Sequence, residues 1–198
     1  RVCIPKHNKQ TPLINIKYDK GVCKQDTLEK FYSPIYLTTN GRVELLNKVK
    51  QYAPANRYAM IVGCHGMGWI PSSTVFKAKK SRYFGGLENG YKIDIDDFAE
   101  SIKAAGMKMQ FILFDDCYMS CMEVAYDLKD ATDYIIASTS EVMDKGMPYH
   151  RIYQHLMATE PNYQAVCDNF YDYYTNYSAP YGTFGVTDCS QLAEGGGM

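Results

Sequence analysis

The sequence predicts an α/β fold with a mostly parallel central sheet, and two observations lead to this prediction. Three short apolar runs, at residues 58–64, 110–115 and 133–138, have the length and composition of buried strands. Between these runs lie segments in which apolar residues recur at helical spacing. Strands that alternate with helices in this way form parallel sheets, which bind ligands beyond the carboxyl ends of their strands.

The elements before the first of these strands are short. Residues 1–4 and 13–17 are expected to form strands, and a turn follows at residues 19–21. Apolar residues at helical spacing predict a helix over residues 42–51, which Pro54 ends.

The strand expected at residues 58–64 is apolar on both faces, as in a parallel sheet that is covered on two sides. A long loop is expected over residues 70–92. Asp94 then caps a helix that runs to Ala105 and stops at Gly106. Three more helices at residues 119–129, 150–158 and 162–176, and a last strand at residues 182–187, complete the predicted elements.

Composition excludes several classes of protein. The 198 residues suit one domain with a real core, so residues 1–198 are expected to form a single domain. The formal net charge is −1 and no basic stripe is present, which argues against a nucleic-acid partner. No apolar run is long enough to span a membrane.

Reactive side chains stand at the ends of two of the predicted strands. The strand at residues 58–64 leads into His65 and a glycine-rich turn, and the strand at residues 110–115 leads to Cys117. A cysteine at a helix start, where Cys117 is expected, is favoured as a thiolate. A histidine beside it can accept its proton. The pattern therefore predicts a cysteine nucleophile, Cys117, with His65 as its partner.

A thiol or zinc site is the chemical alternative. Cys64, His65, Cys117 and Cys121 offer sulfur and nitrogen ligands. Cys117 and Cys121 lie one helical turn apart, but Cys64 and His65 are neighbours on a strand and point to opposite faces. Binding of one metal ion by both is therefore difficult, and no metal ligand is assigned.

The two strand ends resemble the clostripain family of cysteine peptidases, relatives of caspases, gingipains and legumain. That family shows a strand ending in His-Gly-x-Gly-Trp and a later strand ending in Phe-Asp-Ala-Cys-x-Met, which correspond here to residues 65–69 and 114–119. Further similarity runs through residues 123–128, 134–138 and 146–149. The resemblance covers about residues 38 to 190 and implies a caspase-like α/β/α sandwich.

The sequence departs from the family pattern at two positions near these motifs. Asp116 stands where the family has a small residue, and Cys64 stands where serine is common. The chain is expected to lack the family's first strand and C-terminal continuation. An inactive relative that acts as a binding or surface protein is therefore the alternative function.

The resemblance implies peptide-bond hydrolysis through an acyl-enzyme. Cys117 would attack the carbonyl carbon, His65 would carry the proton, and the amides of Gly66 and Cys117 would stabilise the oxyanion. The family cleaves after Arg or Lys, which requires an anion in the specificity pocket, and Asp115 and Asp144 are the candidates. Peptide or protein substrates with Arg or Lys before the scissile bond are the expected partners.

The resemblance also implies activation by cleavage. Relatives are cut in the region between the two motifs, where this chain has Lys77, Lys79, Lys80 and Arg82. We expect self-processing there, which gives a light and a heavy chain that stay packed together. A secreted or cell-envelope location is expected. Calcium is used by some relatives, but the chain has no acidic loop of the EF-hand type, so no cofactor is assigned.

Overall fold

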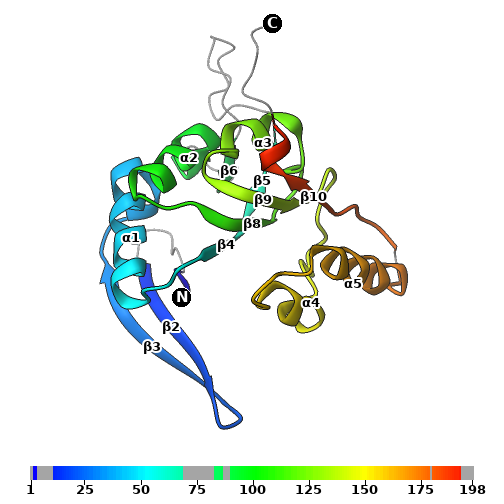
Figure 1. Ribbon diagram of the computed structural model, residues 1–198, viewed down its shortest axis with the longest axis horizontal. Coiled ribbons are helices and arrows are strands. Elements are labelled where there is room, and N and C mark those ends of the chain that lie inside the picture. Colours follow the sequence, from blue (N-terminus) through cyan, green and yellow to red (C-terminus); the bar gives the residue numbers. More distant parts are fainter. Residues whose placement is uncertain (1, 4–10, 69–82, 87–89, 179, 193–198) are drawn as a thin grey trace, which may run out of the picture.

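The structure is a computed structural model that describes residues 2–3, 11–68, 83–86, 90–178 and 180–192 (Figure 1). Its central sheet has four strands in the order β10-β9-β8-β4. The strands β4 (Tyr58–Gly63), β8 (Met109–Asp115) and β9 (Thr132–Ala137) run parallel, while β10 (Gly185–Asp188) is antiparallel to β9. The prediction of a mostly parallel sheet is confirmed.

Helices cover both faces of this sheet. One core contains α1, α2 and α3 and includes Leu46 and Val124, and the other contains α4 and α5 and includes Ile152 and Val166. Figure 1 shows the two groups of helices on different sides of the sheet. The arrangement is an α/β/α sandwich. The helices are α1 (Thr39–Tyr52), α2 (Ile95–Ala104), α3 (Met122–Leu128), α4 (Tyr149–Leu156) and α5 (Tyr163–Thr175), with short 3-10 turns at Ile35–Leu37 and Cys189–Gln191.

Strand β8 lies between the two cores and anchors the centre of the molecule. Ile112 and Phe114 pack in the core with α1, α2 and α3, and Phe111 and Leu113 pack in the core with α4 and α5. All four side chains are buried. Cys117 lies two residues after the end of this strand, so the buried centre of the fold positions it.

Strand β4 is less covered than the sequence suggests. Met60 and Val62 pack against the first core, but Ala59 is exposed and Ile61 is 49% exposed. In the part of the chain that the structure describes, β4 is an edge strand. The expectation of a strand covered on two sides is therefore wrong for this face.

A second small sheet replaces part of the predicted loop. It consists of β5 (His65–Gly66), β6 (Tyr83–Gly85) and β7 (Lys92–Asp94), in that order. The loop expected over residues 70–92 is wrong for β6, since Tyr83 and Phe84 are buried. A strand of three residues followed by glycines has too little periodicity to be recognised in the sequence.

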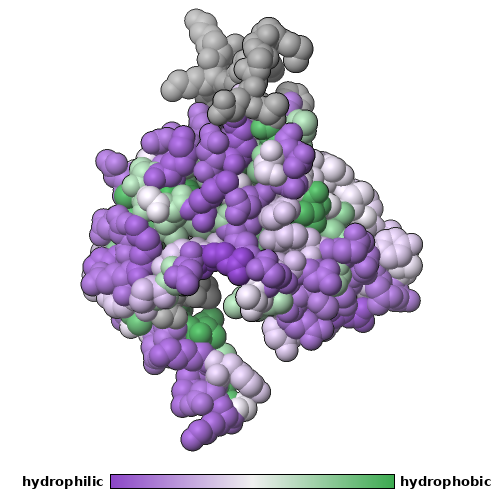
Figure 2. Space-filling view, viewed as in Figure 1, coloured by the Kyte–Doolittle hydropathy of each residue, from purple (hydrophilic) through white to green (hydrophobic). Residues whose placement is uncertain are grey.

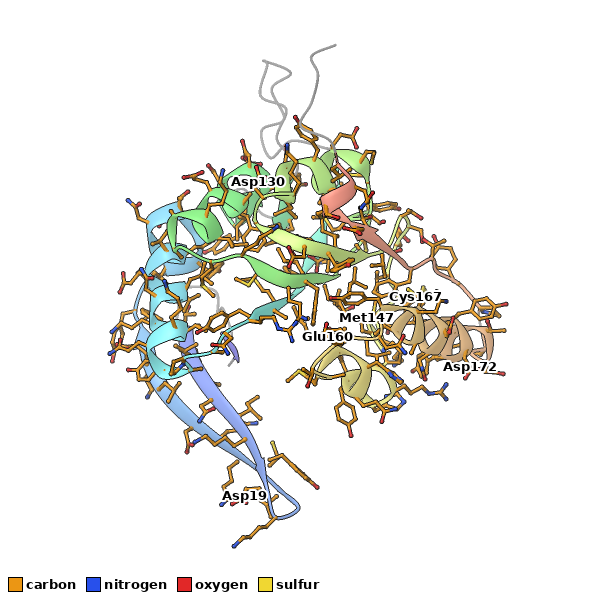
Figure 3. All side chains as sticks on the ribbon, in the orientation of Figure 1. Asp19, Asp130, Met147, Glu160, Cys167 and Asp172 are labelled. Carbon is orange, nitrogen blue, oxygen red and sulfur yellow. The ribbon has the colours of Figure 1, made fainter. Side chains whose placement is uncertain are left out.

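A long hairpin precedes the helices. The strand predicted at residues 13–17 is part of β2 (Thr11–Asp19), which pairs with β3 (Val22–Phe31) and with β1 (Val2–Cys3). The predicted turn at residues 19–21 is present, and Figure 3 shows Asp19 at the hairpin tip, away from the sheet. Strand β3 was missed because most of its side chains are polar and exposed, and the hairpin shows mainly hydrophilic atoms in Figure 2.

Candidate active site

The site begins where β4 and β8 leave the sheet. The last pair of their parallel ladder is Gly63 with Asp115. His65 and Cys117 are each the second residue beyond that pair. The two strand ends that the sequence singled out are therefore neighbours.

Two glycines let the histidine turn (residues 65–68) lie directly against the Cys117 segment (residues 117–120). A Cβ atom added to Gly66 would overlap the carbonyl oxygen of Cys117. One added to Gly68, which has a φ of +54°, would lie 2.5 Å from the carbonyl oxygen of Tyr118. Only glycine permits this approach. His65 itself is exposed to solvent.

The Cys117 segment is also hydrogen-bonded to the loop after β9. The Val142 amide donates to Cys117 Sγ at 3.4 Å. The amides of Tyr118 and Ser120 donate to the carbonyl oxygens of Ser140 and Ser138 at 3.0 and 2.9 Å. These bonds fix the nucleophile candidate between the ends of β4 and β9.

The helix after Cys117 starts later than predicted. It begins at Met122, not at residue 119, because residues 118–120 continue toward the β9 loop and Tyr118 has a φ of +61°. Cys117 therefore lies five residues before the helix and not at its start. The Val142 amide is the donor that the structure provides instead.

Asp115 is tightly held. Its carboxylate accepts hydrogen bonds from the Met147 amide at 3.1 and 3.3 Å and from the Tyr149 hydroxyl at 2.8 Å. Burial, followed by the charge of Asp115, raises the pKa of Tyr149, so the hydroxyl remains a donor. Figure 3 shows Met147 between the sheet and the α4–α5 pair. The carboxylate is thus fixed in position beside Gly146.

Asp144 lies in the same loop but in a different environment. Its side chain is 82% exposed, and Lys145 Nζ lies 4.0 Å from its Oδ2 atom. The loop turns back through a bond from the Gly146 amide to the Met143 carbonyl oxygen. Of the two carboxylates expected from the sequence, only Asp115 is held by hydrogen bonds among the described residues.

Sequence reasoning left Asp116 out of the site, yet the structure places it there. The residue is 1% exposed, and its carboxylate contacts the amide and the thiol of Cys64. Burial raises the pKa of Asp116 to about 7, with Asp115 adding to the effect and Cys64 opposing it. Burial and the charge of Asp116 also raise the pKa of the Cys64 thiol. The available signal was that both positions depart from the family pattern.

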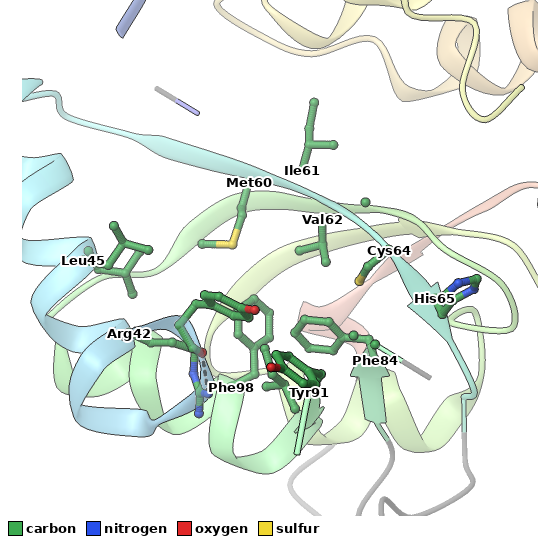
Figure 4. Close-up of a pocket in the computed structure, with 16 residues that line it drawn as sticks. Arg42, Leu45, Met60, Ile61, Val62, Cys64, His65, Phe84, Tyr91 and Phe98 are labelled. Atoms are coloured by element: carbon green, nitrogen blue, oxygen red, sulfur yellow. Dashed lines mark hydrogen bonds between the residues drawn. The ribbon is translucent and has the colours of Figure 1, made fainter. Parts of the chain in front are cut away.

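An apolar cavity runs along β4 toward the site. It has a volume of about 650 Å³ and is lined by Met60, Val62, Phe84 and Phe98, among others, with His65 at one end. Figure 4 shows Met60, Val62 and Cys64 on one side of β4 and Ile61 on the other. The cavity thus borders the histidine turn.

Comparison with known proteins identifies the family. The sequence model that describes the clostripain family matches residues 38–194 of this chain. The chain belongs to the clostripain family. Both the resemblance inferred from the sequence and the fold class are confirmed.

Solved members of the clostripain family share this fold. Iotapain, a secreted C11 cysteine protease from Bacteroides thetaiotaomicron, is 47% identical with a TM-score of 0.87, over 95% of this chain and 55% of its own. A clostripain from Bacteroides thetaiotaomicron ATCC 29148 is 58% identical with a TM-score of 0.53, and the match covers 55% of this chain and 48% of that protein. An inactive zymogen C11 protease from Parabacteroides distasonis is 29% identical with a TM-score of 0.77, and the match covers 95% of this chain and 50% of that protein.

The chain therefore spans about half the length of these clostripain-family structures. Among curated proteins, none matches it. In the described part of the chain, no helix has the length and apolar character needed to cross a membrane.

Two further sequence-based expectations concern other residues of this clostripain-family chain. The expected processing residues Lys77, Lys79, Lys80 and Arg82 lie outside the described residues. Within the described ranges, no three His, Cys, Asp or Glu side chains are grouped so as to hold a metal ion. The zinc alternative that uses Cys117 and Cys121 gains no geometric support from these ranges.

Proposed function

We propose that the protein is a cysteine endopeptidase that hydrolyses peptide bonds after Arg or Lys. The contact between the histidine turn and the Cys117 segment carries this proposal, because a nucleophile and its base must lie together. Membership of a family whose solved members are described as C11 cysteine proteases supports it.

The reaction follows from the roles of two side chains. Cys117 Sγ loses its proton to His65 and forms a bond to the substrate carbonyl carbon. The C–N bond then breaks, and His65 gives the proton to the leaving amine. Water, deprotonated by His65, attacks the thioester, and its C–S bond breaks to release the acid product and restore Cys117.

The Gly66 amide is suited to stabilise the oxyanion with the Cys117 amide. Gly66 lies opposite Phe84 in the β5–β6 pair. The next pair is hydrogen-bonded, because the Met67 amide donates to the Tyr83 carbonyl oxygen at 3.2 Å. Hydrogen-bonded pairs alternate along an antiparallel ladder, so the Gly66 amide points away from β6.

Asp115 and Asp144 are proposed to bind the basic side chain of the substrate. A carboxylate that neighbouring donors fix in place is a preorganised partner for an ammonium or guanidinium group, and Asp115 has this property. The exposed Asp144 would add charge at the rim. The clostripain from Bacteroides thetaiotaomicron was solved with the peptide inhibitor BTN-VLTK-AOMK, in which lysine is the last of four residues.

Self-processing between the motifs is part of the proposal. Residues 67–82 connect β5 to β6, and these strands pair with each other. A cut within this connection would leave both flanks held in one sheet, so the light and heavy chains would stay together. Since Tyr83 is buried, Lys77, Lys79 and Lys80 are favoured over Arg82 as cleavage points. One relative is described as an inactive zymogen. The secreted relatives support a secreted or envelope location.

The test uses a fluorogenic peptide that ends in lysine and a matched peptide that ends in a neutral residue. Cys117→Ala and His65→Ala should each lower kcat by at least about 1,000-fold without loss of the folded state. Cys167→Ala, at a cysteine on α5, is the control and should leave turnover unchanged. Near wild-type turnover in either site variant would overturn the assignment of the dyad, and cleavage of the neutral peptide alone would overturn the specificity.

A further inference from the structure

Asp116 joins the ends of the two strands that carry His65 and Cys117. Its Oδ1 atom accepts a hydrogen bond from the Cys64 backbone amide at 2.5 Å, and the Cys64 thiol donates to Oδ2 at 3.4 Å. The two partners directly precede the two proposed catalytic residues in the sequence. A movement of either partner would therefore move a catalytic residue.

The contact continues the strand pairing by one step. The backbone ladder between β4 and β8 ends at Gly63 and Asp115, and Cys64 and Asp116 are the next residues on each strand. At this step a side-chain carboxylate, not a backbone carbonyl, receives the amide of Cys64. The Asp116 carboxyl is buried and needs a hydrogen-bond partner, so the bond is costly to lose.

Asp116 also contacts the residue on the other side of His65. A Cβ atom added to Gly66 would lie 2.9 Å from Asp116 Cβ. The buried Asp116 side chain therefore packs against both neighbours of His65, which are Cys64 and Gly66. This contact defines the backbone from which the imidazole extends.

The two departures from the family pattern are thus a pair in space. Cys64 and Asp116 lie 52 residues apart in the sequence and are in direct contact. The two residues are complementary. The thiol and the backbone amide of Cys64 are donors, and the Asp116 carboxylate is an acceptor.

We propose that Asp116 is a positioning residue, whose bond to the Cys64 amide holds His65 in place against Cys117. This inference rests on the proposed function for its kinetic effect. A displacement of about 1 Å at a reacting group can cost about 100-fold in rate. The backbone bond carries most of the effect, because the thiol is a weak donor.

The experiment compares three variants in the full chain. Asp116→Asn keeps an acceptor oxygen for the Cys64 amide, and Asp116→Ala removes it. Asp133→Ala removes an exposed carboxylate from β9 of the same sheet and serves as the matched control. With the lysine peptide, Asp116→Ala should lower kcat about 100-fold and change KM less than about threefold. Asp116→Asn and Asp133→Ala should stay within about threefold of wild type.

A second measurement tests the hydrogen bond between the Cys64 amide and Asp116 without using activity. Hydrogen exchange at the Cys64 amide should be slow in wild type and Asp116→Asn and fast in Asp116→Ala, or in Asp116→Ser if the alanine variant does not fold. Wild-type kcat in the folded alanine or serine variant would overturn the proposal, as would equal exchange in all variants. An equal loss of kcat in Asp116→Asn would also overturn it, because charge would then matter more than the bond. If the wild type hydrolyses no peptide, the proposed function fails, while the exchange comparison still tests the contact.

Discussion

At the scale of single residues, the site combines exposed and buried groups for different tasks. His65 is open to solvent, where it can meet a substrate. Asp115 and Asp116 are adjacent, yet one faces the loop before α4 and the other faces the end of β4. Alternation along an extended chain separates their roles. Asp115 is thus available for its proposed role in specificity and Asp116 for its proposed role in positioning.

Asp115→Asn is expected to weaken the preference for basic substrates. The amide side chain keeps the shape of Asp115 and an acceptor for the Met147 amide or the Tyr149 hydroxyl, but it removes the negative charge. Loss of a charge-assisted bond should lower kcat/KM for the lysine peptide about 10- to 100-fold, with a smaller change for the neutral peptide. Kinetics on both peptides give the ratio. An equal loss on both would mean that Asp115 orients the loop and does not select substrates.

At the scale of elements, one buried cation links the first two helices. Arg42 of α1 donates to Ser101 Oγ of α2 at 2.7 Å, to the Asp97 carbonyl oxygen at 3.0 Å and to the Tyr36 carbonyl oxygen at 3.0 Å. The residue is 5% exposed, and burial lowers the pKa of its guanidinium. Every branch of the guanidinium has a partner, so the charge is well satisfied.

Arg42→Met is expected to destabilise the protein by about 3 kcal/mol. The substitution fills a similar volume but leaves the acceptors on α2 and before α1 without their donor. Lys48→Met on the same helix is the control. Lys48 forms a partly exposed ion pair with Glu29 at 3.4 Å, so its loss should cost less than about 1 kcal/mol. Urea denaturation measures both values, and equal effects would contradict the role given to Arg42.

At the scale of the whole molecule, the structure makes stability depend on pH through Asp116. The groups that act on this carboxyl among the described residues are Cys64 after β4, Asp115 of β8 and Tyr149 of α4. Its pKa rises from an ordinary value of 3.8 to about 7 in the folded state, chiefly through burial. The folded state therefore holds this proton more tightly than the unfolded state does.

The protonated Asp116 carboxyl stabilises the folded state at low pH. Stabilisation from the protonated carboxyl is fully present below its ordinary pKa and is lost as the pH rises through about 7. Relative to Asp116→Asn, the wild type should lose unfolding free energy between about pH 4 and pH 8. Denaturation of both proteins across this range tests the prediction. A constant difference between them would show that the carboxyl does not titrate in this window.

Self-processing is expected to depend on Cys117. Wild type should be cut after Lys77, Lys79 or Lys80, and the two chains should co-elute on gel filtration because β5 and β6 stay paired. Cys117→Ala should stay intact under the same conditions. Denaturing gels with N-terminal sequencing locate the cut. Equal cutting of the Cys117→Ala variant would point to another protease.

The sequence by itself determined the elements that carry strong periodicity or strong motifs. The apolar runs of β4, β8 and β9 were recognised because buried strands need them, and the two motifs beside His65 and Cys117 identified the family. Only the tertiary structure decided the rest. The polar β3 and the short β6 exist through pairing with distant residues, which local periodicity does not encode. The contact between Cys64 and Asp116 likewise depends on two strand ends meeting in space. No local pattern can reveal such a contact, because its energy comes from residues far apart in the chain.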